Sequence, residues 1–276
     1  MFLVGQFQKL ERAFRIWKTL LILLFFLWLD SRKWTYLKGY KFERRERRQI
    51  LRAKWITQEL VDLGSAFIKL GQLLSARADV IPSSWVNELT SLQDRVPPFK
   101  FEKVQEILVF ELGSSYEQII NIDSNAIGSA SLAQVHRATL INGENVIFKV
   151  QRPGIEKFFR LDLDVMNQVA RLVQNNKSIS QGKDWVGIAK ECKRVLIREL
   201  DFRIEAQYAA RFKQQFLDDS EILIPSVIWN LSSSKVLCLE YIPGIKINDI
   251  KTLKNNGINT SSIAKIGATS YLKQLV

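Results

Sequence analysis

A chain of 276 residues in which 47% are apolar can bury a substantial core, which excludes a mainly disordered protein. The net charge of +12 is concentrated in residues 1–60, which hold 14 Lys and Arg against 5 Asp and Glu. A basic end of this kind favours an acidic partner, either nucleic acid or an anionic membrane surface. Cys192 and Cys238 lie far apart and His136 is the single histidine, so no metal-ligand spacing occurs and a reducing compartment is expected.

Residues 1–42 predict a membrane-associated segment. Thr19–Leu29 is an uncharged apolar run of 11 residues with basic residues on both sides. It is shorter than the about 20 apolar residues that span a bilayer, and no signal-peptide cleavage site follows it. One interpretation is a helix lying in the membrane interface, with Trp17, Trp28 and Trp34 near the headgroups, and the alternative is a buried helix packed on the domain. Nucleic-acid binding is disfavoured, because the basic cluster that follows contains glutamates and lacks a base-stacking pattern.

Residues 43–113 are predicted to form a helical extension. Apolar residues recur at helical spacing over 43–78, which indicates two helices or one kinked helix ended by Pro82. Shorter helices are predicted over 85–93 and 101–111, with a turn at 94–98 between them and Gly113 after the last.

A polar row interrupts the apolar pattern of the first part of this extension. Lys69, Gly71, Gln72 and Asp79 follow one another within a few helical turns. Glycine inside a helix costs about 1 kcal/mol relative to alanine, so we interpret Gly71 as a place where another backbone comes close. The polar residues then need partners elsewhere in the fold. The alternative interpretation is a solvated amphipathic helix, and this stretch alone does not decide between them.

The periodicity becomes that of strands after residue 113. Strands are predicted over 118–122, 133–141 and 145–151, with a hairpin turn at Asn142-Gly143 and a loop of small residues over 127–133. Lys149 lies between apolar neighbours in the last strand, where an unpaired buried charge is costly, so an anion is expected nearby. Backbone N–H groups of a small-residue loop can approach a phosphate that this lysine neutralises, an arrangement similar to the nucleotide roof of protein kinases.

A helix over 188–216 is predicted to supply carboxylates that pair with Lys69 and Lys149. Asp201 and Glu205 are four residues apart on one face, and Glu199 lies about 120° around the helix from Glu205, at ~100° per residue. The helix is therefore predicted to offer Glu205 to Lys149 and Glu199 to Lys69. The alternative is that these carboxylates are surface charges paired with neighbouring arginines.

The remaining elements form a second hairpin and two helices. A strand is predicted over 227–231 and another over 235–241, and Glu240–Gly244 then breaks the pattern as the hinge between kinase lobes does. Helices are predicted over 247–253 and 261–275.

Taken together, these motifs resemble the UbiB/ADCK family of atypical protein-kinase-like proteins of bacteria, mitochondria and plastids. The signature is Lys69-Leu70-Gly71-Gln72, the family's KxGQ, together with the loop around Gly128–Ala133, Val150–Gly154 after Lys149, and Glu199-Leu200-Asp201. The motif wording is similar to that of cyanobacterial or plastid members. The resemblance implies membrane association on the cytoplasmic side.

The resemblance also implies the cofactor and the roles of the site residues. ATP with Mg²⁺ is the expected cofactor, and the expected partners are the nucleotide, a membrane lipid or isoprenoid-quinone precursor, and proteins of quinone biosynthesis. The residues expected to bind the nucleotide are Gly128, Ser129, Ala130, Ser131, Ala133, Lys149 and Glu205. The residues expected to regulate it are Lys69, Gly71, Gln72, Glu199 and Asp201, with the KxGQ helix folded over the place of a protein substrate. That blocks protein phosphorylation, and ATPase or small-molecule kinase activity is implied instead.

One departure from the family pattern concerns catalysis. The family's catalytic loop and its later metal-binding aspartate are expected after a segment like Ala264–Val276, so the catalytic and Mg²⁺-binding residues are missing from the sequence as written. A truncated or split gene product is one interpretation, and the other is a non-catalytic membrane-bound binding or scaffold protein, or a pseudogene product. An incomplete large lobe is expected to expose the apolar residues Ile247, Ile250, Ile263, Ile266, Tyr271 and Leu275.

The sequence therefore predicts an α+β fold in four parts. These are a membrane-associated segment (1–42), a helical KxGQ extension (43–113), a kinase-like small lobe (114–244) and the start of a large lobe (245–276).

Overall fold

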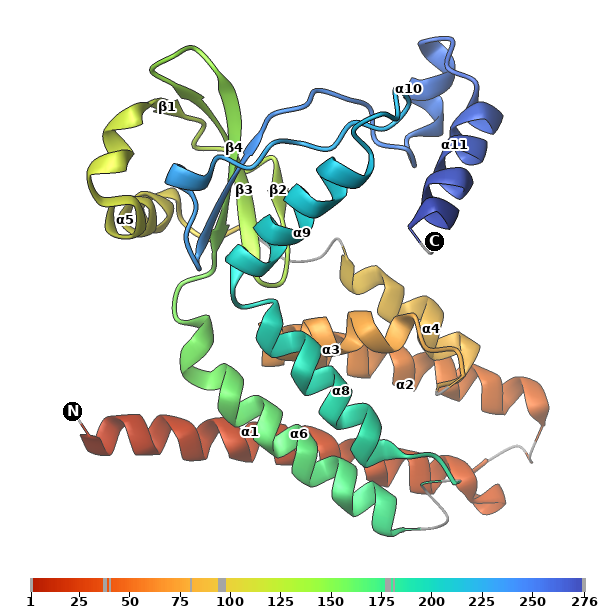
Figure 1. The fold of residues 1–276 in the computed structure, drawn as a ribbon. Coiled ribbons are helices and arrows are strands. Elements are labelled where there is room, and N and C mark those ends of the chain that lie inside the picture. Colours follow the sequence, from red (N-terminus) through yellow and green to blue (C-terminus); the bar gives the residue numbers. More distant parts are fainter. Residues whose placement is uncertain are drawn as a thin grey trace.

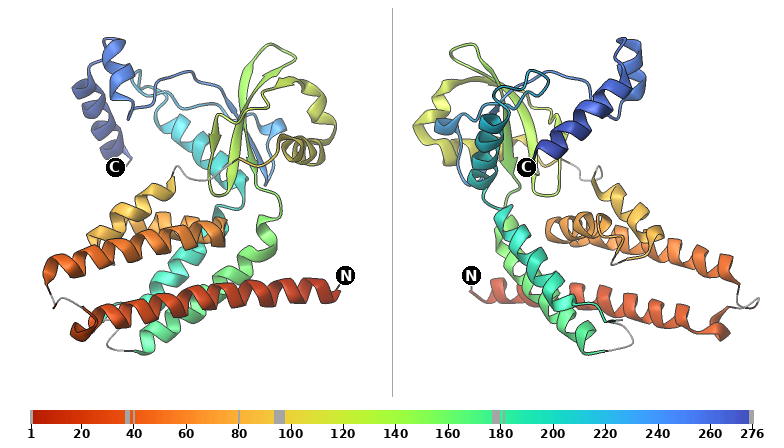
Figure 2. Two further views of the ribbon diagram at one scale, coloured as in Figure 1. Left: turned by 180° about the vertical axis from the view of Figure 1, so that it is seen from behind. Right: turned by 45° about the vertical axis from the view of Figure 1, so that its right-hand side comes forward.

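The computed structural model describes residues 2–36, 39, 41–79, 81–93, 98–176, 180 and 182–274. A layer of helices lies below a small sheet in Figure 1, and both further views keep this arrangement (Figure 2). The helical layer consists of α1 (Phe2–Ser31), α2 (Phe42–Leu63), α3 (Ser65–Ser75), α4 (Ser83–Thr90), α6 (Ile155–Asn175) and α8 (Trp185–Arg198). Single 3-10 turns are η1 (Lys33–Thr35), η2 (Ser91–Gln93), η3 (Gly113–Gln118) and η4 (Trp229–Leu231).

The sheet is antiparallel in the order β1-β3-β4-β5, and the short β2 pairs with β3. Its strands are β1 (Ile119–Ile122), β2 (Gly128–Ser129), β3 (Ala133–Leu140), β4 (Asn145–Gln151) and β5 (Val236–Glu240). The predicted turn at Asn142-Gly143 is confirmed, because Gly143 has a φ of +85° and its N–H donates to the Leu140 carbonyl at 2.9 Å. Left-handed φ values of this kind favour glycine.

Side chains alternate along the strands, so each face of the sheet packs against its own helix. Phe148 and Cys238 are paired across β4 and β5, and both are buried against α5 (Phe101–Leu112). Lys149 and Leu237 are the next pair and face the other way, towards α9 (Phe202–Gln215), where Leu237 packs in a small core. Successive side chains of a strand point to opposite faces, so a lysine flanked by buried residues emerges on the α9 face.

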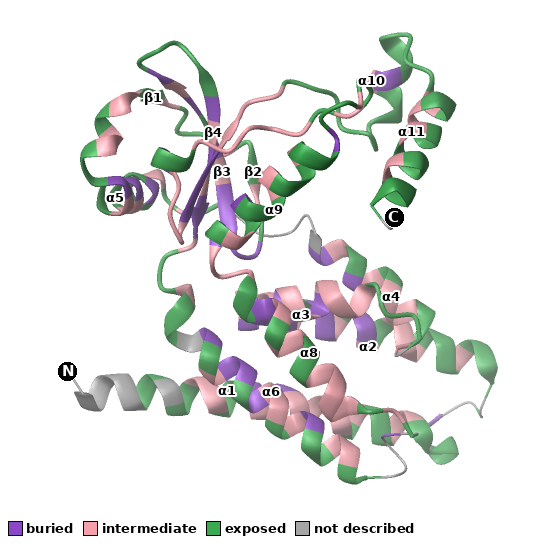
Figure 3. Cartoon of the chain, viewed as in Figure 1, coloured by how far each residue is buried: buried purple, intermediate pink, exposed green. Residues whose placement is uncertain are grey.

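The largest core joins helices that are far apart in sequence. Leu60 and Phe67 of α2 and α3 pack with Phe159 and Leu163 of α6 and Leu196 of α8. Thus α6 and α8, which fall within the predicted small lobe, pack in the helical layer, whereas α5, predicted as part of the extension, packs on the sheet. The interior of both layers is buried, as Figure 3 shows.

Three predicted elements differ from the structure. The helix predicted over 188–216 is two helices, α8 and α9, separated at Glu199–Asp201, because Asp201 caps α9 by accepting the N–H of Arg203 at 3.0 Å. The strand predicted over 227–231 is an isolated bridge at Val227 followed by η4. Finally, α6 was not predicted, although Phe159, Leu163, Met166 and Ala170 recur at helical spacing.

Other predicted elements are confirmed. The pattern over 43–78 forms two helices, α2 and α3, which meet at Gly64 with a φ of +86°. The strands β1, β3 and β4 and the helix α5 lie within a residue or two of their predicted bounds. The predicted turn at 94–98 falls largely outside the described residues.

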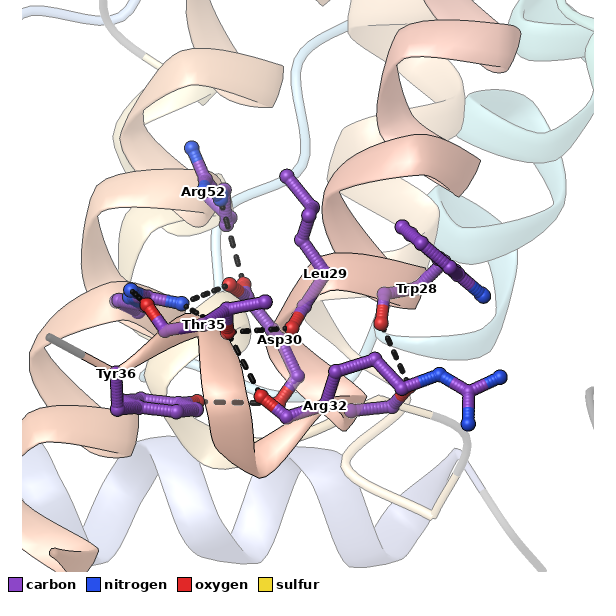
Figure 4. Close-up of polar contacts among 9 residues, drawn as sticks. Trp28, Leu29, Asp30, Arg32, Thr35, Tyr36 and Arg52 are labelled. Carbon is purple, nitrogen blue, oxygen red and sulfur yellow. Dashed lines mark hydrogen bonds and ion pairs between the residues drawn. The ribbon is translucent and has the colours of Figure 1, made fainter. Parts of the chain in front are cut away.

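The corner between α1 and α2 is built around Asp30 (Figure 4). Its carboxylate lies 3.4 Å from an Arg48 guanidinium nitrogen and 3.3 Å from that of Arg52, and its carbonyl accepts the Tyr36 hydroxyl at 3.0 Å. Thr35 accepts a hydrogen bond from Arg48 at 2.9 Å. Arg48, the last residue of the basic cluster 41–48, is therefore engaged in this corner, whereas most of the cluster is exposed.

The α1 helix both packs on the domain and exposes an apolar face. Ile16 and Thr19 are buried, and Trp17 and Leu23 pack against the core of the helical layer. The opposite side carries a row of exposed side chains, with an exposed fraction of 71% at Phe7 and 54% at Phe25. No helix in the described residues is long and apolar enough to cross a bilayer.

A buried ion pair connects α1 to α6. Asp162 is 2% exposed, and its two carboxylate oxygens accept hydrogen bonds from Arg12 at 2.9 and 2.8 Å. Arg12 also donates to the Leu63 carbonyl at the end of α2. One guanidinium thus links three helices. Burial raises the pKa of Asp162, and the bonds to Arg12 oppose that rise.

The last two helices lie beside the far end of α9. The α10 helix (Ile250–Asn255) buries Leu253, whereas the described residues of α11 (Thr260–Lys273) include none that are buried (Figure 3). The Lys273 ammonium lies 2.6 Å from the Asp219 carboxylate and attaches α11 to the segment after α9. Of the residues predicted to be exposed, Ile247, Ile250 and Tyr271 are exposed and Ile263 and Ile266 are half-buried; Leu275 lies outside the described residues.

We expect Arg12→Met to lower the free energy of unfolding by about 3 kcal/mol, because it leaves the Asp162 carboxylate buried without its partner. Urea denaturation measures this loss. Arg15→Met is the control, since Arg15 makes a single surface hydrogen bond of 3.4 Å to Asp62, and the double variant Arg12→Met/Asp162→Leu is expected to recover most of the loss. Equal losses in Arg12→Met and Arg15→Met would contradict this account.

The loss of unfolding free energy in Arg12→Met is also expected to depend on pH. Without Arg12 the pKa of Asp162 rises further, because burial then acts unopposed. A carboxyl group whose pKa is raised by folding stabilises the protein while protonated and loses that contribution as pH rises through its folded pKa. The deficit relative to the unmutated chain is therefore smallest at acidic pH and grows as the pH is raised.

Candidate functional site

A cavity of about 480 Å³ lies where the sheet and α9 face α3 and α8. Its wall combines Lys69 and Gln72 from α3, residues 130–133 before β3, Lys149 from β4, and side chains of α8 and α9. This volume lies within the range of about 300–1,000 Å³ that is usual for small-molecule sites. Both predicted lysines and both predicted glutamates line this cavity.

The first pair in the cavity is Lys149 with Glu205. The Lys149 ammonium lies 2.7 Å from each oxygen of the Glu205 carboxylate and 5.0 Å from the centroid of the Phe202 ring. The strand alternation directs Lys149 out of the sheet, and Glu205 lies in the first turn of α9, which covers that face. The lysine is about one-quarter exposed, so its ammonium is within reach of a ligand in the cavity.

The second pair joins α3 to the end of α8. The Lys69 ammonium lies 2.9 Å from the Glu199 carboxylate, and both side chains are partly shielded from water. Glu199 is the C-terminal cap residue of α8. The two predicted ion pairs therefore form, although the glutamates belong to two helices and not to opposite flanks of one.

The turn Glu199-Leu200-Asp201 is fixed by contacts with the sheet. The Leu200 carbonyl accepts a hydrogen bond from the buried Gln151 side chain of β4 at 2.8 Å. The Phe202 N–H donates to the Ser234 carbonyl before β5 at 2.9 Å. Backbone groups freed by the break in the helix are thus satisfied by hydrogen bonds to the neighbouring sheet, which stabilises the break in this partly shielded position.

Asp201 lines the cavity, but it has partners of its own. Its carboxylate pairs with the Arg203 guanidinium at 2.7 Å and caps α9. The Arg203 hydrogen bond holds the pKa of Asp201 below its usual range. The prediction that Asp201 and Glu205 share one helix face is wrong, because Asp201 precedes the helix.

The small-residue loop divides into two parts. Gly128 and Ser129 form β2, paired with Val135 and Gln134, and do not line the cavity. Residues 130–133 do line it. The Ala130 N–H donates to the Ala133 carbonyl at 2.8 Å, whereas the N–H groups of Ser131 and Leu132 have no acceptor among the described residues. These two donors remain available to a bound anion.

Arg152 braces this loop from behind. Its guanidinium donates to the Ala130 carbonyl at 3.0 Å and to the Ser129 hydroxyl at 2.9 Å, and burial lowers its pKa. Its backbone N–H donates to the Leu132 carbonyl at 2.9 Å. Sequence reasoning assigned no role to Arg152. The signal available was its position directly after the lysine strand, in the Arg152-Pro153-Gly154 turn.

Gly71 and Gln72 serve the packing of α3. A Cβ atom on Gly71 would collide with the Leu92 side chain and would lie 3.0 Å from Leu60, so α3 packs closely against leucines of its own layer. The interpretation that another backbone approaches Gly71 is therefore wrong, because the neighbours are side chains. Gln72 donates to the Leu92 carbonyl at 3.1 Å, which fixes α3 to the segment after α4. Asp79 does not share the row, since its carboxylate pairs with Arg77 at 2.7 Å.

The described residues contain no group of three or more His, Cys, Asp or Glu side chains arranged to hold a metal ion. His136 is buried and serves the fold. Its ring nitrogens contact the Asp123 carbonyl at 2.7 Å and the Gln134 amide at 2.8 Å. Partial burial raises the pKa of Cys192, and full burial raises that of Cys238 to about 12.

A sheet lysine paired with a helix glutamate, beside a loop of small residues, defines a kinase-like small lobe. Residues 91–276 match the family described as the ABC1 atypical kinase-like domain, and the chain belongs to this family. Curated relatives include UbiB and ACTIVITY OF BC1 COMPLEX KINASE proteins. The resemblance inferred from the sequence motifs is thereby confirmed.

Three relatives illustrate the range of the similarity. The chain is 40% identical to protein sll1770 of Synechocystis over 99% of its own length. It is 40% identical over 98% of its length to the chloroplastic ACTIVITY OF BC1 COMPLEX KINASE 7 of Arabidopsis thaliana, and 34% identical over 87% to a probable protein kinase UbiB of Azotobacter vinelandii. The chain spans 47%, 39% and 45% of these proteins, which is less than half of each.

We expect Arg152→Leu to loosen residues 129–133 while leaving the rest of the sheet folded, because two hydrogen bonds to this loop are lost. Amide hydrogen exchange measures the change. Exchange of the Ala130 N–H, which donates to the Ala133 carbonyl at 2.8 Å, should accelerate relative to that in β5. Arg137→Leu is the control, since Arg137 lies outside the cavity wall and stacks on Tyr241 at 4.3 Å. Unaltered exchange in the loop of Arg152→Leu would refute the bracing role.

Proposed function

We propose that this chain binds the phosphates of ATP in the cavity between the sheet and the helical layer, as part of an atypical kinase or ATPase of the UbiB/ABC1 type. The observation that carries the proposal is the Lys149–Glu205 pair beside two unpartnered backbone N–H groups, those of Ser131 and Leu132. A lysine held by a helix glutamate, next to free main-chain donors, is the arrangement that kinases use for nucleotide phosphates.

The residues of the cavity fit the phosphate part of the nucleotide. Lys149 would neutralise the phosphates, Glu205 would hold the ammonium in place, and Ser131 and Leu132 would donate their N–H groups. When bound, ATP with Mg²⁺ supplies the phosphoryl group and the metal charge that assists its transfer.

The Lys69–Glu199 pair is proposed to hold α3 against this cavity. It connects the KxGQ helix to the end of α8, so opening the cavity on that side requires breaking a 2.9 Å ion pair. A link to isoprenoid-quinone synthesis follows from the family and remains part of the proposal.

We further propose that α1 associates with an anionic membrane surface. Its exposed side carries Phe7, Leu10, Phe14, Leu21, Phe25 and Trp28 at helical spacing. Trp34, in the turn η1 that follows α1, is 73% exposed, and Arg32 stacks on Trp28 at 5.5 Å. An apolar stripe with aromatic and basic neighbours is typical of helices that lie in a membrane interface.

A non-catalytic, membrane-associated binding or scaffold protein is the second candidate function. The exposed stripe of α1 favours it as much as the first, because membrane binding belongs to both. The two candidates differ in whether the cavity binds nucleotide.

Titration of the purified chain with ATP and Mg²⁺ by calorimetry separates the candidates. We expect Lys149→Ala to weaken ATP binding roughly 10- to 100-fold, as expected for the loss of one charge-assisted contact. Lys193→Ala is the matched control, because it removes an ion pair of 2.9 Å on the outside of α8. Absence of ATP binding in the unmutated chain would favour the scaffold, and equal affinities of the two variants would exclude the proposed role of Lys149.

Co-sedimentation with vesicles tests the membrane proposal. We expect Phe14→Ser/Leu21→Ser to reduce binding to vesicles containing anionic lipid, because two apolar contacts of 69% and 60% exposure are lost. The control is Phe110→Ser/Leu217→Ser, which removes side chains of 83% and 65% exposure from α5 and from the segment after α9. Binding should also fall as salt is raised. Equal effects of both double variants would argue against α1 as the contact.

A further inference from the structure

The cavity contains one cation that its own carboxylates do not compensate. Its wall includes four basic side chains, of which Lys69, Lys149 and Arg194 pair with Glu199, Glu205 and Glu191 at 2.9, 2.7 and 2.6 Å. The lining carboxylate of Asp201 pairs with Arg203. Arg198 is the fourth, and no carboxylate of the described residues lies within ion-pair distance of it.

Arg198 is held in place by a tyrosine instead of an acid. Its guanidinium donates to the Tyr208 hydroxyl and lies 5.8 Å from the centroid of the tyrosine ring. Tyr208 is three residues after Glu205 on α9, and it lines the same cavity. The contact crosses the break between α8 and α9. A guanidinium has five N–H donors, so most of them remain free after this single bond.

These observations point to an anion. An uncompensated guanidinium that is oriented by a neutral partner retains its full charge and its planar donor fork, which match phosphate geometry. We propose that Arg198, positioned by Tyr208, is a second anion-binding position of the cavity, distinct from Lys149, and that it binds a phosphate or diphosphate group. This inference rests on the proposed nucleotide function for its chemistry, but it concerns different residues.

The phosphate can come from two sources. It belongs either to the nucleotide itself, beyond the phosphates held by Lys149, or to a second ligand that carries its own phosphate or diphosphate. In the first case a free diphosphate competes with ATP. In the second case both bind together. A purely structural role is the competing explanation, since a cation in the last turn of α8 also stabilises the helix dipole.

The experiment uses the full chain, with inorganic diphosphate and Mg²⁺–ATP as separate probes in calorimetry. We expect Arg198→Gln to weaken diphosphate binding about tenfold, as for the loss of one charge-assisted contact, and Arg198→Lys to restore part of it. Tyr208→Phe should weaken diphosphate binding less than Arg198→Gln, because it removes only the hydroxyl that orients the guanidinium. Arg211→Gln is the control, since it removes the same charge from an exposed position of α9 outside the cavity wall.

Thermal unfolding of each variant shows whether the fold is retained, and the Arg198→Lys variant keeps the test decisive if Arg198→Gln does not fold. A loss of ATP affinity in Arg198→Gln, with competition between diphosphate and ATP, assigns the nucleotide as the source. Unchanged ATP affinity with lost diphosphate binding assigns a second ligand. Either result supports the proposal.

The proposal is overturned if the unmutated chain binds no diphosphate and Arg198→Gln binds ATP as tightly as the unmutated chain. It is also overturned if diphosphate binding is equal in Arg198→Gln and Arg211→Gln. Failure of the proposed nucleotide function gives a different result, namely that ATP does not bind while diphosphate binding still depends on Arg198.

Discussion

The turn formed by Glu199, Leu200 and Asp201 is the constraint on which the site depends. A continuous helix would place Glu199 and Glu205 at fixed angles on one axis, whereas the turn lets α8 follow the helical layer and α9 follow the sheet. Each glutamate then meets its lysine at ion-pair distance. The turn persists because the Gln151 side chain at the end of β4 donates to the Leu200 carbonyl, and the Ser234 carbonyl before β5 accepts the Phe202 N–H.

The same turn connects α8, which packs in the core of the helical layer, to α9, which packs on the sheet. The helical layer has its own apolar core, and the sheet is covered by α5 on one face and α9 on the other. The cavity lies where these units face one another, and most of the charged side chains along it are paired. Charges at such a boundary are partly shielded from water, which strengthens their pairing relative to fully exposed pairs. Arg198 departs from this pattern, because its partner is the neutral hydroxyl of Tyr208.

The N-terminal helix α1 packs on the domain with one side and exposes apolar residues on the other. Its composition does not show which residues belong to which side. Its apolar run suggested either a membrane-interface helix or a buried helix, and α1 has one buried side and one exposed side. Arg12, outside that run, makes the contact that links α1 to α6. A hydropathy pattern reports how apolar a segment is, but it does not report which side another helix covers.

The local elements and the chemistry of the site were readable from the sequence, because they depend on short-range properties. Strand alternation around Lys149, the Asn142-Gly143 turn and the small residues before β3 are each encoded within a few positions. The family resemblance identified both lysines and both glutamates. The sequence did not predict α6, the division of the helix at 199–201, the leucines packed over Gly71, or the role of Arg152.

Composition and local patterning therefore define which kinds of residues are available and which strands and helices carry most of them. Which of these residues meet depends on how the layers pack. Lys69 and Glu199 are 130 positions apart and Gln151 is 49 positions from Leu200, and contacts at such separations depend on how whole layers pack. The helical pattern across 199–201 favoured continuation, but the hydrogen bonds offered by the sheet outweighed that local preference, because buried backbone groups must find partners wherever the fold provides them.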